Sequence, residues 1–162
     1  NIRRKQIPDA MLAFRSFLDS LPKEEAKDCY MVLKTEKVTD AGTDLPKVKE
    51  YFFNENYKDN VIFIDQKLSE QQLNWLCNMA DAHILLTSNE GWGLANTEAM
   101  LAGTPIIANV LTIEVPIKNM VNGHSQFTQL VDQFKVHLKL LIFLMIDVSG
   151  KMQLTELKNV IN

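Results

Sequence analysis

Hydrophobic residues in the first part of the chain recur with the period of an amphipathic helix. They stand at positions 7, 11, 14, 18 and 21, a spacing that puts them on one face of a helix. Pro8 and Asp9 suit its first turn, because proline loses no hydrogen bond there and the helix dipole favours an acidic group. The pattern predicts a helix over residues 7–21.

Further along, short apolar runs alternate with helical patterns. Four runs are typical of buried strands, at residues 30–33, 61–64, 84–86 and 105–108. Helices are predicted between them over residues 45–56, 69–80 and 94–102, and Ser69 with Gln72 forms a capping box for the second. The alternation predicts an α/β fold, a Rossmann-like doubly wound parallel sheet with helices on both faces. Such folds bind ligands at the carboxyl ends of their strands.

The last third of the chain is mainly helical in pattern. Residues 127–145 continue a helical period, and residues 154–161 suggest a final helix. The most apolar run, residues 140–146, is far shorter than the roughly 20 residues that cross a bilayer. We interpret it as a buried helix segment; a face for a missing domain and a peripheral membrane contact are the alternatives.

Composition narrows the class of protein. The 162 residues fit one domain, and a net charge of −3 gives no general attraction to nucleic acid. Cys29 and Cys77 have no spacing that suggests zinc, so we expect reduced core thiols and a cytoplasmic location. The N-terminus lacks the pattern of a signal peptide, and a chain that begins at Asn1 without methionine is expected to be a piece of a longer protein.

The most informative segment joins the third predicted strand to the helix that follows. Glu90 and Glu98 stand eight positions apart around a glycine-rich turn formed by residues 91–93. Glycine lets the backbone approach a ligand closely, and the N-terminus of the next helix favours a phosphate. The two carboxylates can accept hydrogen bonds from hydroxyl groups on either side of the phosphates. This arrangement suits a sugar bound to a nucleotide; a plain strand, turn and helix with solvated glutamates is the alternative.

These residues resemble a known family signature. Glu90 and Glu98 look like the two glutamates of the E-x7-E signature of retaining glycosyltransferases with the GT-B fold. The other residues that match the signature are Gly91, Gly93, Leu94, Ala99, Met100, Gly103 and Pro105. The resembled group contains glycogen synthase, sucrose synthase and many bacterial and viral sugar transferases. In that group the signature belongs to the C-terminal, donor-binding domain.

The resemblance implies roles for the residues of the signature. Glu90 would contact hydroxyls of the donor sugar, and Glu98 would hold the nucleotide ribose. The amides around Trp92, Gly93 and Leu94 would face the sugar and the diphosphate, and Gly91 would belong to the same donor-binding turn. Trp92 stands where the family usually has phenylalanine.

Two further segments gain a role from the resemblance. Arg3, Arg4 and Lys5 precede the first helix, and cations there could neutralise a diphosphate leaving group. Lys5 matches the family's lysine best; the family's arginine would fall at or before Asn1 unless Arg3 or Arg4 replaces it, and a solvated basic terminus is the alternative. Leu68 follows the second strand, where similar enzymes let the backbone meet the nucleotide base.

Other candidate groups carry less chemistry. His83 opens an apolar strand and is interpreted as a structural histidine, and His124 and His137 carry no functional prediction. No Asp-x-Asp pair is present, so we expect no metal site and no cofactor, with a nucleotide diphosphate sugar as the donor substrate. Helix dipole and cations would carry the charge of the leaving group.

The resemblance is good over residues 3–110 and poor over residues 111–162, where the family's Gly-Gly turn is replaced by Leu111 and Thr112. We therefore expect a single nucleotide-sugar-binding domain, the donor-binding half of a retaining glycosyltransferase, inactive without a separate N-terminal acceptor-binding domain. A non-catalytic nucleotide-sugar-binding or interaction module is the second hypothesis, and a sugar-nucleotide epimerase is the third.

Overall fold

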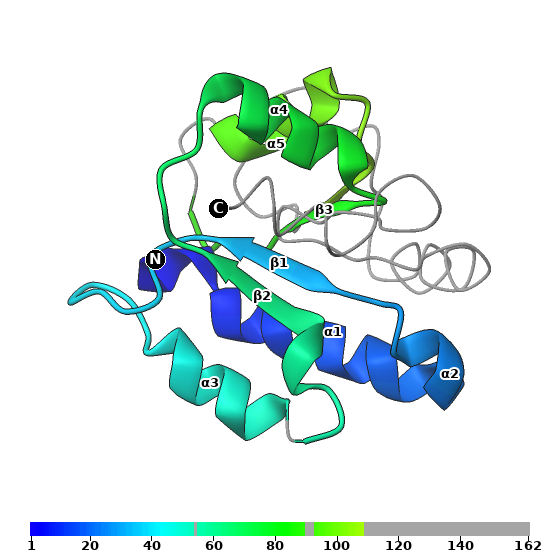
Figure 1. The fold of residues 1–162 in the computed structure, drawn as a ribbon. Helices are drawn as coiled ribbons and strands as arrows, with labels where there is room; N and C mark the ends of the chain where they lie inside the picture. The colour runs from blue at the N-terminus through cyan, green and yellow to red at the C-terminus, as the bar shows by residue number, and fades with distance from the viewer. Residues whose placement is uncertain (54, 90–92, 109–162) are drawn as a thin grey trace.

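The computed structural model describes residues 1–53, 55–89 and 93–108 (Figure 1). The helices predicted over residues 127–145 and 154–161 and the apolar run 140–146 lie outside these ranges, as do Glu90, Gly91 and Trp92. The elements are, in order, η1 (Arg3–Lys5), α1 (Ile7–Ser20), α2 (Lys23–Ala26), β1 (Met31–Lys34), α3 (Leu45–Phe52), η2 (Lys58–Asn60), β2 (Val61–Ile64), α4 (Glu70–Met79), β3 (His83–Leu85), α5 (Leu94–Leu101) and β4 (Ile106–Ala108).

The strands form two parallel pairs. β1 pairs with β2 in a register that sets Met31 opposite Val61, and β3 pairs with β4 with His83 opposite Ile106. Figure 1 shows α1 and α3 on one side of the β1–β2 pair and α4 and α5 on the other. The mixed α/β, Rossmann-like fold with parallel strands and helices on both faces is confirmed.

The first helix forms where the hydrophobic period predicts it. The buried side chains of α1 belong to the hydrophobic core. They are Ile7, Ala10, Met11, Phe14 and Leu18. The ring of Phe14 is fully buried, with its centroid 6.0 Å from that of Phe53. Aromatic pairs at this separation add to the free energy of area burial.

The cap of α4 is also as predicted. The Ser69 hydroxyl accepts the Gln72 backbone N–H at 3.2 Å, and the Gln72 side chain accepts the Ser69 N–H at 2.9 Å. This satisfies two N–H groups at the helix start and fixes where the chain turns from β2 into α4.

Two predictions of helix extent are corrected. The helix predicted over residues 45–56 ends at Phe52, because Phe53 leaves helical geometry (φ −114°, ψ 83°) and its ring is buried against the core. The short helix α2 was missing from the predictions; Pro22 precedes it, and one turn is too short to show a hydrophobic period.

Cys29 and Cys77 are buried thiols, as predicted. Burial, with a smaller contribution from the nearby Glu98 carboxylate, raises the pKa of Cys77 to about 11. Across the described ranges, none of the helices is long and apolar enough to span a bilayer.

Candidate functional site

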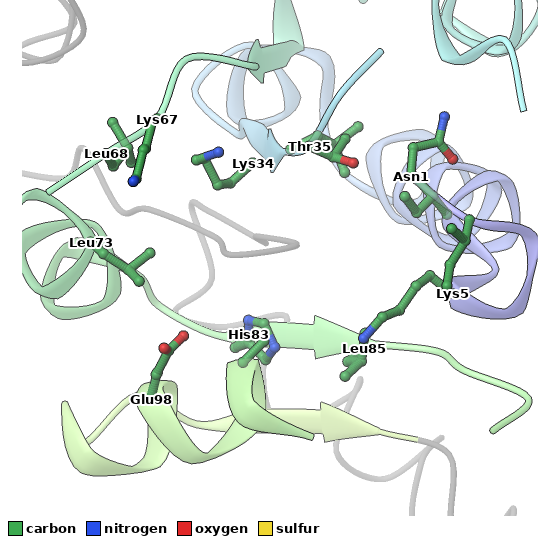
Figure 2. Close-up of a pocket in the computed structure, with 14 residues that line it drawn as sticks. Asn1, Lys5, Lys34, Thr35, Lys67, Leu68, Leu73, His83, Leu85 and Glu98 are labelled. Carbon is green, nitrogen blue, oxygen red and sulfur yellow. The ribbon is translucent and has the colours of Figure 1, made fainter. Parts of the chain in front are cut away.

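A cavity of about 530 Å³ lies between β1 and β3, next to α5 (Figure 2). Its polar lining residues come from the N-terminal segment, the end of β1, the segment after β2, the start of β3, and α5. They are Asn1, Lys5, Lys34, Thr35, Lys67, His83 and Glu98. The apolar lining residues are Ile2, Ile7, Leu33, Leu68, Leu73, Leu85 and Ala95. The volume is in the range of small-molecule sites, and the mixed lining is typical of them.

Glu98 enters this cavity from the second turn of α5. Figure 2 shows its carboxylate directed into the space between α5 and the segment that follows β2. The side chain is exposed, and within the described residues its carboxylate has no hydrogen-bond or ion-pair partner. The group is therefore available to accept hydrogen bonds from a ligand's hydroxyls.

The start of α5 is set by a glycine in an unusual conformation. Gly93 is the N-cap residue with φ 77° and ψ 51°, the left-handed region that glycine adopts without steric cost. Gly93 has no side chain to cap the first turn, and the helix dipole favours an anion at this end. Leu94 begins the helix and exposes 68% of its surface.

Lys5 reaches the cavity from the opposite side. Figure 2 shows its ammonium directed toward His83 and Leu85 on β3. The proximity of this charge is one of the causes that lower the pKa of His83. Lys5 and Glu98 thus place one positive and one negative group on the wall of the same cavity.

Arg4, predicted to bind the donor, contacts the protein's own backbone. Its guanidinium donates to the Asn89 carbonyl at 2.7 Å, and its carbonyl accepts the Ser88 N–H at 2.9 Å and the Thr87 hydroxyl at 3.0 Å. Arg4 is not among the cavity's lining residues. It holds the turn that leads toward Glu90, and a direct contact of Arg4 with a donor remains a prediction.

His83 is the buried titratable group of the cavity wall, with 3% of its surface exposed. Burial lowers its pKa to about 4, the neighbouring Asn96 side chain opposes the shift, and the Lys5 charge adds to it. The imidazole is therefore neutral at physiological pH. Burial fits the structural role expected for His83, but its place in the cavity wall does not follow from the strand pattern.

Leu68 lines the cavity, as its predicted place after β2 implies, whereas Lys34 and Lys67 were missing from the predicted site. Lys34 ends β1, and Lys67 is the third residue after β2. The rule that ligands lie at the carboxyl ends of parallel strands would have indicated both. Because no motif marks them, their side chains read as ordinary solvated lysines in the sequence.

Within residues 1–53, 55–89 and 93–108, His, Cys, Asp and Glu do not gather in any group of three or more that could hold a metal ion. The groups that the structure brings to the cavity are cations, one carboxylate, a neutral imidazole and apolar surface. They suit an organic ligand with phosphate and hydroxyl groups.

The Rossmann-like fold and this cavity are those of an α/β domain with room for an organic ligand at its strands. A family model described as "Glycosyl transferases group 1" matches residues 4–141, most of the chain, and the protein belongs to this family. It is accordingly a glycosyltransferase domain, whose reaction moves a sugar from a nucleotide sugar donor. Comparison with curated proteins and with solved structures gave no match.

Proposed function

We propose that the protein is the donor-binding half of a retaining glycosyltransferase of the GT-B type. The supporting observation is that Glu98 and Lys5 face one cavity beside the glycine-capped start of α5. A nucleotide diphosphate sugar carries hydroxyl groups and a diphosphate, which these groups match in charge and hydrogen bonding.

The predicted site residues other than Arg4 and Leu68 have the following places in this proposal. The Glu98 carboxylate accepts hydrogen bonds from the ribose hydroxyls, and the backbone amides of Gly93 and Leu94 face the diphosphate. Lys5 neutralises the charge that develops on the leaving diphosphate, which lowers the barrier to departure. Glu90, with the turn at Gly91 and Trp92, contacts the sugar; this part rests on the E-x7-E spacing of Glu90 and Glu98.

The proposed transfer needs no metal. The helix dipole at Gly93 and the ammonium of Lys5 supply positive charge where the diphosphate leaves. The acceptor would be held by a separate N-terminal domain, and the chain alone would bind the donor without transferring its sugar. Joined to that domain, it would form a product with the same anomeric configuration as the donor.

The test is calorimetric titration with UDP, GDP and ADP, with and without magnesium. We expect at least one nucleotide to bind without magnesium, and Glu98→Gln to weaken it by about tenfold, since hydrogen bonds to a charged group contribute about 1.5–3 kcal/mol each. Glu50→Gln is the matched control, because Glu50 is an exposed glutamate on α3, on the other side of the β1–β2 pair. A Glu98→Gln protein that binds as tightly as the parent would contradict the proposal.

A further inference from the structure

Two lysines stand at the part of the cavity where β1 and β2 end. Lys34 is the last residue of β1, and Lys67 lies in the segment between β2 and α4. Both line the cavity, and neither ammonium has a hydrogen-bond or ion-pair partner among the described residues. This contrasts with the neighbouring Lys37, which is paired with Asp65 at 2.9 Å.

The order of groups around the cavity indicates which part of a ligand meets these lysines. Figure 2 shows Lys5 on one side, Glu98 on the other, and Leu73, Leu68 and Lys67 beyond Glu98. In a nucleotide sugar, the ribose lies between the diphosphate and the base. If the diphosphate lies at the start of α5 and the ribose at Glu98, as the proposed function has it, the base reaches the surface formed by Leu68, Leu73 and the two lysines.

The lining of this region suits a base better than a second phosphate. Leu68 and Leu73 are half-buried and offer apolar surface to the face of a planar ring. A phosphate gains nothing from such surface, whereas a ring that covers it removes apolar area from water. The lysines can then reach only the polar edge of the ring.

The chemistry of that edge is set by the lysines themselves. An ammonium has three donors and no acceptor, so it can bond to a carbonyl oxygen but not to an exocyclic amino group. Uracil and guanine carry an exocyclic carbonyl where cytosine and adenine carry an amine. We infer that Lys34 and Lys67 select a donor nucleotide whose base bears this carbonyl, uracil or guanine, over cytosine and adenine.

The experiment compares nucleotides that differ at this group. UDP and CDP differ in the carbonyl or amine of a pyrimidine, and IDP and ADP differ in the carbonyl or amine of a purine. Calorimetry on the parent is expected to give about tenfold tighter binding of the carbonyl member of at least one pair. The reason is that a lysine N–H facing the exocyclic amine of the other member has no acceptor there, which disfavours binding of that nucleotide. The pair that shows the preference also distinguishes a pyrimidine from a purine site.

Variants then separate base selection from general attraction to anions. Lys34→Met with Lys67→Met is expected to reduce the preference within the pair to below about twofold. Lys58→Met, which removes an exposed lysine of η2 that pairs with Glu55 and lies outside the cavity, should leave the ratio unchanged. Each lysine variant is checked by circular dichroism for the parent's fold.

The outcomes distinguish this inference from the proposed function. If both members of each pair bind equally and Glu98→Gln weakens nucleotide binding, base selection is overturned and the proposed donor site is retained. A double variant that weakens both members equally would assign the lysines to a phosphate and overturn it as well. Binding of no nucleotide would overturn the proposed function and this inference together.

Discussion

The two parts of the described structure are stabilised in different ways. Residues 1–64 contain almost all of the largest fully buried side chains, among them Phe14, Phe53, Met11 and Leu18. Residues 83–104 contain four of the five buried polar residues, His83, Thr87, Asn96 and Thr104, and only Ile84 among those large side chains. The first part is a packed scaffold, whereas in the second the Thr87 and Thr104 hydroxyls donate hydrogen bonds to backbone carbonyls.

The difference follows from what each part has to do. A scaffold needs bulk, because each buried large apolar side chain contributes about 1.5–3 kcal/mol. A binding segment needs defined backbone positions, which hydrogen bonds and glycine conformations provide without filling the cavity. Exposed apolar residues on the second part, such as Leu94 and Leu101, are in keeping with its smaller share of the core.

The largest expected effect tests the scaffold. Phe14→Ala removes a fully buried ring that contacts Phe17 and Phe53, and should lower the free energy of unfolding by about 3–5 kcal/mol. Urea denaturation followed by circular dichroism measures it. Leu12→Ala on the same helix, where Leu12 is 47% exposed, is the control and should cost far less. Equal costs for the two variants would contradict a scaffold held by packing.

The next effect tests the polar part through pH. The folded-state pKa of His83 is about 4, below the ordinary value of 6.5, so the folded protein resists protonation that the unfolded chain accepts. The contribution of neutral His83 to the free energy of unfolding is therefore fully present above pH 6.5. It is lost as the pH falls toward 4, by about 3 kcal/mol in total. Unfolding curves between pH 4.5 and 7 measure the slope, and His83→Gln should flatten it. A parent stability that does not change over this window would show that His83 is not held neutral.

The smallest effect tests one hydrogen bond of the polar part. The Thr104 hydroxyl donates to the Cys77 carbonyl at 2.7 Å and connects the end of α4 to the segment before β4. Thr104→Val keeps the shape and should cost about 1 kcal/mol, since the carbonyl still accepts the Ala80 N–H. Thermal denaturation compares it with Thr97→Val, whose hydroxyl makes a longer, 3.4 Å bond within α5. An equally small loss in both variants would weaken the contrast between the two parts.

The sequence was sufficient for the parts of the fold that depend on local patterns. The period of α1, the capping box of Ser69 and Gln72, and the end of α5 near Gly103 each depend on residues within a few positions of one another. The end of α3 was mispredicted, because it depends on the burial of Phe53 against Phe14, a contact between residues far apart in the chain.

The site likewise divides into residues that local patterns predict and residues that only the tertiary structure brings together. The signature predicts Glu98 and the glycine turn, and Lys5 follows from a cluster of cations; the structure brings Lys5 and Glu98 to one cavity. Lys34, Lys67 and His83 reach that cavity because β1, β3, the segment after β2 and α5 lie around it, and no local pattern records this arrangement. The hydrogen bonds of Arg4 to the 87–89 turn are likewise set by tertiary structure.

The connection between Arg4 and the turn at residues 87–89 also bears on the order of folding. These hydrogen bonds join residues more than 80 positions apart, so they form only after the chain between them has closed into a loop. Closing a loop of this length carries an entropic cost that packing of the scaffold must first offset. We therefore expect the segment that leads into Glu90 to be among the last to be fixed, so that the proposed donor site is complete only in a molecule that has already folded.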